Sequence, residues 1–301
     1  MSTAPAPPRS HVPDSVPADV LVDEELVRDL VASQHPDLAG PVRRFAEGYD
    51  NVLFRVGPAW LARMPRRRAG ALTLRRETEV LPHLAGTLGP FELPWPRREG
   101  VPSGRYPYPW ALVRWHDGHL PDPHTSSPAR SRRIADLLAR LHRAAPSGPT
   151  DAARSMPLRH RDDALRRHLA ELPCLAAERP LLLDRWERAL AASPWSGPPV
   201  WVHGDLHPFN LLERDGAITV VLDWGDAFVG DPAPDLAAAW MLLDPEHHGP
   251  VRERVDAATW ARGLGWTVWL RVMLGQAVAH GAPSFRPITD ALSRRLAQSD
   301  G

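Results

Sequence analysis

The sequence predicts an α+β chain of two lobes, in which a small antiparallel sheet with one helix precedes a larger, mainly helical part. Short apolar runs divided by turn residues crowd residues 41–64, as in antiparallel strands. Helical spacing of apolar residues prevails from 128 to 279. Two polar motifs end short apolar runs within that helical part, at 200–205 and 218–224. We expect the lobes to flank a cleft, where small ligands usually bind.

The chain opens with a segment whose composition favours disorder. Residues 1–19 are rich in Pro, Ser and Ala and contain few large apolar side chains. An amphipathic helix is expected at 23–36, where Asp23 is placed to cap the first turn. The apolar face of this helix consists of Leu26, Val27, Leu30 and Val31. The predicted first lobe spans 20–118.

The rest of the first lobe alternates between strands and one helix. Glycine, aspartate and proline at the turns separate its first three strands. The expected elements are strands at 41–48, 51–57, 59–65, 91–96 and 108–115 and a helix at 70–86. Proline interrupts the fourth of these strands, which makes it a poor partner in a sheet.

The predicted second lobe, 119–301, is mainly helical. Its helices are expected at 128–145, 160–172, 179–193, 232–243 and 254–279, with short strands at 200–205 and 218–224. Because the polar motifs lie on the two strands, we expect the chemistry of the protein to be concentrated there.

The composition excludes some classes of partner. Lys+Arg and Asp+Glu both number 36, so the formal net charge is zero. A general nucleic-acid binder normally has a basic surplus, and we therefore expect no nucleic-acid partner. The sequence contains no lysine, so any site that requires a cation must use Arg or His.

Cysteine usage and hydropathy also limit the possibilities. Cys174 is the single cysteine, which excludes an intramolecular disulfide and a Cys-based zinc site. The start of the chain lacks the apolar core of a secretory leader, and no run approaches the ~20 apolar residues that span a bilayer. We expect a cytoplasmic monomer without a membrane partner.

Two polar segments point to phosphoryl transfer. In the segment 203–210, which reads HGDLHPFN, Asn210 follows Asp205 by five positions. In the second segment, the apolar run 218–222 leads directly into Asp223. This is the layout of a kinase catalytic loop followed by a metal-binding loop.

The residue types in these segments suit the chemistry. Phosphoryl transfer needs positioning and charge neutralisation more than covalent help from the protein. One carboxylate must orient the acceptor hydroxyl and accept its proton, and Asp205 is placed for that role. Mg²⁺ prefers hard oxygen ligands, and Asn210 and Asp223 offer an amide oxygen and a carboxylate oxygen. The spacing lets one loop present Asp205 and Asn210 to the same phosphate region.

Together the two segments resemble the signature of the aminoglycoside phosphotransferase family, whose members have the fold of protein kinases. The similarity includes the tripeptides at 230–232 and 235–237, and it extends over about residues 41–280. It implies an enzyme that uses Mg²⁺ and moves the γ-phosphate of ATP or GTP to a hydroxyl of a small molecule. An antibiotic, aminoglycoside or macrolide-like, is the implied kind of acceptor.

By the same resemblance, the first lobe covers and grips the nucleotide. A turn of small and polar residues lets backbone N–H groups approach the phosphates. Arg63 stands where kinases carry the phosphate-gripping lysine, and Glu77 stands where the family's helix glutamate pairs with that cation. The end of the last strand resembles the hinge that reads the purine. The implied nucleotide-binding residues are Gly48, Asn51, Arg63, Glu77, Arg114 and His116.

Two other functions stay open at this level. The pattern His203-x-Asp205-x-His207 is similar to a dinuclear metal motif, so a metal-dependent hydrolase is one alternative. A catalytically inactive nucleotide-binding module of the same fold is the other. The complete set of catalytic and metal-binding side chains favours an enzyme. The acceptor and the choice between ATP and GTP are not determined by the sequence.

Several side chains near the motifs have more than one interpretation. His203 is expected to pack under the metal loop, while His207 is open between structure and substrate contact. Asp226 and Asp231 are expected to cap a following helix, with Mg²⁺ or substrate as the alternative ligand. The arginine-rich stretch 154–167 is interpreted as a solvated helix face rather than a nucleic-acid patch.

Overall fold

The computed structural model describes residues 17–95, 97–145 and 147–298. They divide into two compact units, one formed by the described residues of 17–82 and 94–116 and the other by those of 83–93 and 117–298. The predicted disordered segment lies outside the described residues except for 17–19. None of the described helices is both long enough and apolar enough to cross a bilayer.

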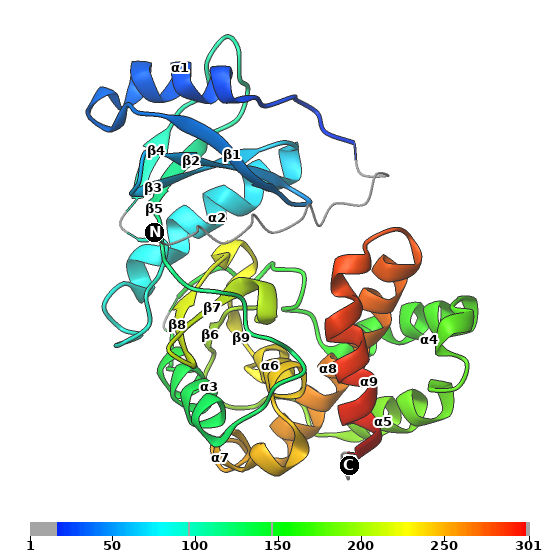
Figure 1. The fold of residues 1–301 in the computed structure, drawn as a ribbon. Helices are drawn as coiled ribbons and strands as arrows, with labels where there is room; N and C mark the ends of the chain where they lie inside the picture. The colour runs from blue at the N-terminus through cyan, green and yellow to red at the C-terminus, as the bar shows by residue number, and fades with distance from the viewer. Residues whose placement is uncertain (1–16, 96, 146, 299–301) are drawn as a thin grey trace. The chain divides into compact units, whose positions relative to one another are not determined.

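The first unit is built on a five-stranded antiparallel sheet with the strand order β1-β2-β3-β5-β4. Figure 1 shows helix α1 over one face of this sheet and helix α2 along the other. The elements are α1 (Glu24–Gln34), β1 (Val42–Glu47), β2 (Asn51–Val56), β3 (Trp60–Pro65), α2 (Arg68–Leu84), β4 (Arg97–Gly100) and β5 (Trp110–Arg114).

Helix α1 closes one face of the sheet through its apolar stripe. Asp23 caps the helix as expected, because its side chain accepts a hydrogen bond from the backbone N–H of Leu26 at 2.8 Å. The stripe joins a buried cluster that includes Phe54 and Met64 from the strands. Successive side chains of a strand point to opposite faces, so β3 turns Met64 toward α1 and Arg63 toward α2.

The strand expected at 91–96 is wrong, and the fourth strand begins later. β4 starts at Arg97 and pairs with β5. Pro94 and Pro96 cannot donate backbone hydrogen bonds to a sheet, which excludes the predicted segment from a regular ladder. Glu92 instead makes an isolated bridge to Val220 in the second unit's own sheet region.

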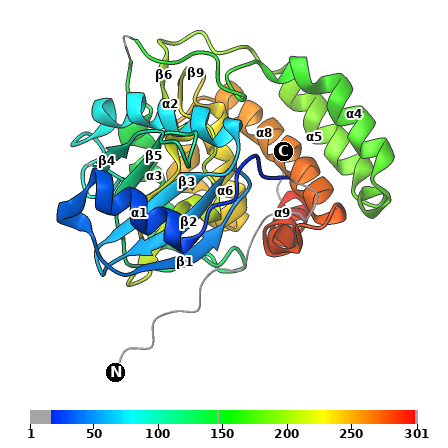
Figure 2. The same ribbon diagram turned by 90° about the horizontal axis from the view of Figure 1, so that it is seen from above.

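The second unit contains helices and two short antiparallel strand pairs, β6 with β9 and β7 with β8. In Figures 1 and 2, α5 runs close to α8, and the two helices are in contact. The elements are α3 (Pro128–Leu141), α4 (Asp162–Glu171), α5 (Arg179–Ala191), β6 (Val200–Val202), β7 (Leu211–Arg214), β8 (Ala217–Val221), β9 (Phe228–Gly230), α6 (Ala237–Leu242), α7 (Gly249–Arg252), α8 (Ala257–Ala279) and α9 (Arg286–Gln298).

Four regular elements of the second unit, β7, β9, α7 and α9, were not expected from the pattern. β7 and β9 are too short to show alternation, and they exist because partner strands supply their hydrogen bonds. A two-residue turn joins β7 to β8, with φ angles of 51° at Asp215 and 75° at Gly216. This Asp-Gly pair is a hairpin signal. α9 also carries a helical apolar stripe, which includes the buried residues Ile288, Leu292 and Leu296.

Candidate active site

Two segments of the second unit span the same gap between paired strands. β6 pairs with β9 and β7 pairs with β8, both antiparallel. The segments 203–210 and 222–227 therefore each run from one strand pair to the other. A backbone hydrogen bond of 2.9 Å from Leu222 N to Asn210 O joins them. This topology places the predicted metal-loop aspartate beside the predicted catalytic loop.

A buried carboxylate, Asp235, holds the start of the catalytic loop. It accepts hydrogen bonds from the backbone N–H groups of His203, at 2.8 Å, and Gly204, at 2.9 Å. His142 Nε2 lies 3.1 Å from the same carboxylate. Because Asp235 is fully buried, its removal would leave two backbone donors unsatisfied. Asp235 lies within the family-like segment 235–237, but its role in holding the loop was not predicted.

Gly204 allows the two segments to approach closely. Its φ is +80°, in the left-handed region that glycine favours. A Cβ atom at this position would lie 2.4 Å from the backbone oxygen of Asp226. A larger residue here would push the catalytic loop away from the metal loop.

His203 packs under the metal loop, as expected. Its Nε2 donates to the backbone oxygen of Leu222 at 2.9 Å, and its Nδ1 accepts from the backbone N–H of Asp205 at 3.2 Å. The ring also contacts Trp224, with 4.6 Å between centroids. With both nitrogens bonded to backbone, His203 has no lone pair to offer a metal.

His207 serves the loop itself. Its Nδ1 accepts from the backbone N–H of Phe209 at 3.1 Å, which caps the short turn at Pro208–Asn210. Its Nε2 lies 3.3 Å from Asp205 Oδ2. Both histidines of the supposed dinuclear motif are therefore engaged within the loop. Among the residues that the structure describes, no three His, Cys, Asp or Glu side chains form a group that could hold a metal ion.

Asp205 keeps partial exposure among several polar partners. Its side chain is 24% exposed, and its Oδ1 lies 2.7 Å from Arg154 Nη1. Asn210 Nδ2 donates to its backbone oxygen at 2.9 Å and lies 3.4 Å from Oδ2. Burial by itself raises the pKa of the Asp205 carboxyl, but Arg154 and His207 outweigh it and lower the pKa well below its usual value. Asp205 is therefore ionised at neutral pH, as an acceptor of a hydroxyl proton must be.

Asn210 and Asp223 fit a hard divalent cation by their donor chemistry. Because the amide nitrogen of Asn210 is bonded to Asp205, its amide oxygen is left as the ligand atom. Asp223 has φ 58° and ψ 74°, a left-handed conformation that Asp tolerates better than most residues. Such strained backbone is typical of functional sites.

Two further acidic residues of the motif differ in their surroundings. Burial is the largest cause that raises the pKa of Asp226, and the charges of Asp205 and Asp223 act in the same direction. Asp231 instead accepts from the backbone N–H of Ala233 at 3.0 Å, which confirms the expected capping role for this residue. It also pairs with Arg262 at 2.8 Å.

The first unit contains the expected pair of Arg63 and Glu77. Arg63 Nη1 lies 2.7 Å from Glu77 Oε1 and 2.5 Å from Oε2. A second cation, Arg97, contacts the same carboxylate at 2.9 Å and also donates to the backbone oxygen of Leu74 at 3.0 Å. Sequence reasoning missed Arg97 because it did not place a strand at 97–100. The role of the pair in binding nucleotide stays a prediction.

The predicted nucleotide-covering turn joins β1 to β2. Gly48 N donates to the backbone oxygen of Asn51 at 2.8 Å and closes the turn. Asp50 anchors it to the start of α2, because its carboxylate accepts from Arg67 at 2.8 Å. A Cβ atom at Gly70, in the first turns of α2, would lie 2.4 Å from the backbone oxygen of Asp50. The tight contact with α2 explains how a short polar turn is held in one place.

The predicted hinge residues lie at and after the end of β5. Arg114 pairs across the sheet with Trp60, and its guanidinium lies 4.3 Å from the centroid of that indole. Trp115 N donates to Ala59 O at 2.8 Å and extends the pairing. His116 follows as a half-buried residue. The sequence therefore located this strand end correctly, while contact with a purine stays a prediction.

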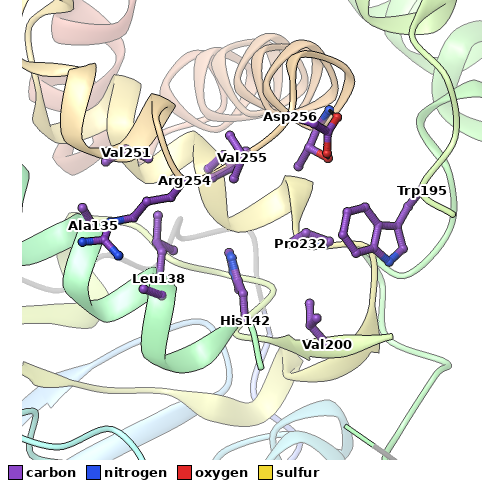
Figure 3. A pocket seen from close by; sticks show the side chains of 13 residues that line it. Ala135, Leu138, His142, Trp195, Val200, Pro232, Val251, Arg254, Val255 and Asp256 are labelled. Atoms are coloured by element: carbon purple, nitrogen blue, oxygen red, sulfur yellow. Dashed lines mark hydrogen bonds between the residues drawn. The ribbon is translucent and has the colours of Figure 1, made fainter. Parts of the chain in front are cut away.

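A pocket of about 410 Å³ lies in the second unit, away from Asp205. Figure 3 shows Leu138 and His142 on one side of it and Val255 across from them. Asp205, Asn210 and Asp223 are not among its lining residues. His142 also contacts Asp235, which holds the start of the catalytic loop, so the pocket lies on the side of the loop away from the candidate catalytic and metal-binding side chains.

Comparison with known proteins relates the whole arrangement to one family. The model of the phosphotransferase enzyme family matches residues 41–269, most of the chain. Viomycin phosphotransferase of Streptomyces vinaceus is 31% identical over 250 residues, which cover 75% of this chain and 82% of that protein. The predicted motifs at 203–210 and 223–226 both lie inside the matched region.

Solved structures share the fold at lower identity. A phosphotransferase determined with GDP and kanamycin matches with a TM-score of 0.67 and 21% identity, over 91% of this chain and 99% of that one. The macrolide 2'-phosphotransferase of Brachybacterium faecium, determined as the apoenzyme, matches with a TM-score of 0.56 and 22% identity, over 92% and 99%. These matches confirm the predicted α+β, protein-kinase-like fold.

Proposed function

This chain belongs to the phosphotransferase enzyme family and is a small-molecule phosphotransferase, and from that premise we propose that it moves the γ-phosphate of ATP or GTP to a hydroxyl group of its acceptor. The observation that carries the proposal is the contact between the catalytic loop and the metal loop. Asp205 and Asn210 are hydrogen-bonded to each other, and Leu222, which precedes Asp223, is bonded to Asn210.

Asp205 acts as the base in this proposal. Its ionised carboxylate accepts a hydrogen bond from the acceptor hydroxyl and orients one oxygen lone pair toward the γ-phosphorus. As the new O–P bond forms, the bond to the β–γ bridging oxygen breaks and the hydroxyl proton passes to Asp205. The partial exposure of Asp205 leaves room for this contact.

Asn210 and Asp223 would hold Mg²⁺ in the same site. The ion, when bound, supplies positive charge that neutralises phosphate oxygens. The hydrogen bond from Leu222 N to Asn210 O, which brings Asp223 beside Asn210, supports a shared cation at this position. Asp226 is a further candidate ligand, while Asp231 is already committed to a helix cap and to Arg262.

The first unit would bind the nucleotide. Arg63 is held by Glu77 and retains 11% side-chain exposure, enough to reach a phosphate oxygen. Gly48 and Asn51 would cover the phosphates, and the strand end at Arg114 and His116 would contact the base. The phosphotransferase structure determined with kanamycin also contains GDP. A bound nucleotide there supports a nucleoside triphosphate as the phosphate donor here.

The acceptor class follows from the relatives. One acts on viomycin by its name, one was determined with kanamycin, and one is a macrolide phosphotransferase. We propose a hydroxylated antibiotic as the acceptor, bound by the helices of the second unit. A cytoplasmic monomer suits this role, since nucleoside triphosphates are available in the cytoplasm.

A direct test separates this function from the inactive module. Purified protein is incubated with Mg²⁺, γ-labelled ATP or GTP, and viomycin, kanamycin or a macrolide in turn. Label on an acceptor supports the proposal, and the mass of the product should rise by one phosphate. If nucleotide binds but neither transfer nor hydrolysis occurs, the protein is a binding module and the proposal is wrong. The hydrogen bonds that His203 and His207 make within the loop count against the hydrolase alternative.

A further inference from the structure

Arg154 lies in the segment between α3 and α4, and most of its side chain is shielded from solvent. The prediction of a solvated helix face over 154–167 is wrong for Arg154, because α4 begins only at Asp162. The Arg154 side chain is 19% exposed. Its Nη1 lies 2.7 Å from Asp205 Oδ1 and also donates to the backbone oxygen of Gly204. One nitrogen thus binds both the carboxylate and the backbone of the catalytic loop.

A second arginine supports the segment that carries Arg154. Arg161 donates through Nη2 to the backbone oxygen of Ala153. Its guanidinium lies 5.0 Å from the ring centroid of Trp266 and 4.9 Å from that of Trp269, both on α8. The stacked guanidinium is anchored to a long helix, so Ala153 and the following residue are fixed relative to that helix.

Arg154 completes the restraint on the Asp205 carboxylate. On the other oxygen, Oδ2, His207 Nε2 lies at 3.3 Å and Asn210 Nδ2 at 3.4 Å. The carboxylate is therefore held from both sides, and its rotation about the Cβ–Cγ bond is limited. Among the described residues, Arg154 is the one partner of Oδ1, so the second lone pair of Oδ1 remains for an acceptor hydroxyl.

We infer that Arg154 is a positioning residue for phosphoryl transfer, which holds the Asp205 carboxylate in the orientation that receives the acceptor hydroxyl. The inference rests on the proposed function. Arg154 acts through Asp205 and the Gly204 carbonyl, so it controls the rate of the chemical step and leaves the binding of nucleotide unchanged. Its single-nitrogen contacts also mean that a lysine ammonium, with three donors, reproduces them.

The experiment compares three variants with the wild type. Arg154→Met removes the charge and both contacts, Arg154→Lys restores a cation, and Arg159→Met removes an exposed arginine nearby as a matched control. Each protein is assayed for transfer to viomycin, kanamycin and a macrolide, and for hydrolysis of ATP and GTP, all with Mg²⁺. Thermal denaturation of each variant reports any loss of folding.

The expected pattern is a split between kcat and KM. Arg154→Met should lower kcat by about 100-fold, as misplacement of a reacting group by about 1 Å does, with the nucleotide KM unchanged. Arg154→Lys should recover most of the rate, and Arg159→Met should match the wild type. The melting temperatures should stay close together, since Arg154 is partly exposed.

Two results would overturn the inference and one would point elsewhere. If Arg154→Met keeps its kcat, the contact has no part in transfer. If Arg154→Met and Arg154→Lys lose activity and melting temperature equally, Arg154 is only structural. If the wild type neither transfers nor hydrolyses, the proposed function itself fails and the inference fails with it. The first two results leave wild-type activity intact, so the two kinds of failure are distinguishable.

Discussion

Each unit of the molecule places arginine against a carboxylate, and the two arrangements differ in exposure. In the first unit, Glu77 is fully buried and is shared by Arg63 and Arg97. In the second unit, Asp205 is 24% exposed beside Arg154. The buried carboxylate of Glu77 can act on a ligand only by positioning its arginine partners. The partly exposed carboxylate of Asp205 can contact a ligand directly, so exposure distinguishes the candidate base from the positioning group.

The energetic consequences should differ in the same way. Removing one partner from a buried ion pair leaves an uncompensated charge in a medium of low dielectric constant, which costs about 3–5 kcal/mol. Water screens the partly exposed pair to a greater extent, so its loss should cost less stability than loss of the fully buried pair. We expect substitution of Glu77 to affect mainly folding and substitution of Asp205 to affect mainly the rate of transfer.

Asp205→Asn should give the largest effect. The amide cannot accept the hydroxyl proton as a carboxylate does, so the rate of transfer should fall by roughly 10²–10⁴-fold. The melting temperature should change little, because the amide is the same size. The measurement is label transfer from the γ-phosphate beside a melting curve. A variant that keeps its rate would show that Asp205 is not the base.

Glu77→Gln should give the largest loss of stability. It leaves two arginines at a buried position without a full counter-charge, and the free energy of unfolding should fall by about 3–5 kcal/mol. Glu79→Gln is the matched control, because Glu79 is exposed on the same helix. Urea unfolding of the two variants measures the difference. Equal stability of the two would contradict the distinction between buried and partly exposed carboxylates.

His248 tests what a buried titratable group does when it is kept neutral. Burial lowers its pKa to about 4. In the unfolded chain His248 is protonated below about pH 6.5, whereas in the folded protein it stays neutral down to about pH 4. The free energy of unfolding should therefore fall as the pH drops from about 6.5 to about 4. The loss has an upper bound of about 3 kcal/mol.

The measurement is urea unfolding between pH 7 and pH 4.5. His248→Gln should unfold with a flatter pH dependence, because glutamine does not titrate. Its amide can still donate to the Leu243 carbonyl that His248 contacts at 3.2 Å, so the hydrogen bond is kept. If wild type and variant lose stability in parallel as the pH falls, His248 is not the group responsible.

Arg63→Met and Arg97→Met should differ from each other in their effect on nucleotide binding, and this difference is the smallest effect expected. Arg63 keeps 11% side-chain exposure and Arg97 keeps none. Loss of Arg63 should raise the nucleotide KM about tenfold, as expected for one charge-assisted hydrogen bond. Loss of Arg97 should lower the melting temperature with a much smaller change in KM. If both variants raise the nucleotide KM equally, the proposal that Arg63 binds nucleotide while Arg97 stabilises the fold is wrong.

Parts of the fold could be predicted because their signals are local. The apolar stripe and cap of α1, the strands between 41 and 65 and the position of Asp205 were read from neighbouring residues. β9 could not be predicted, because it is three residues long and needs β6 to supply its hydrogen bonds. β4 was displaced by the prolines before it, which forbid pairing where apolar composition suggested a strand.

The candidate site shows the same limit at the level of side chains. The motif spacing located Asp205, Asn210 and Asp223, since one loop and one strand end carry them. Asp235 and Arg154 were missed as partners of the loop, although both touch it directly. Arg154 could not be singled out, because it lies in an arginine-rich segment where the sequence does not distinguish a paired arginine from a solvent-exposed one.

The amino-acid sequence alone determined which chemical groups are available and how they are spaced along the loop. It contains a carboxylate five positions before an amide, a second carboxylate after an apolar run, and no lysine anywhere. Only the tertiary structure decided that Arg154 pairs with Asp205, that Arg97 joins Arg63 on Glu77, and which carboxylate keeps contact with water. The physical reason is that spacing constrains residues on one element, whereas pairing and burial depend on how distant segments pack.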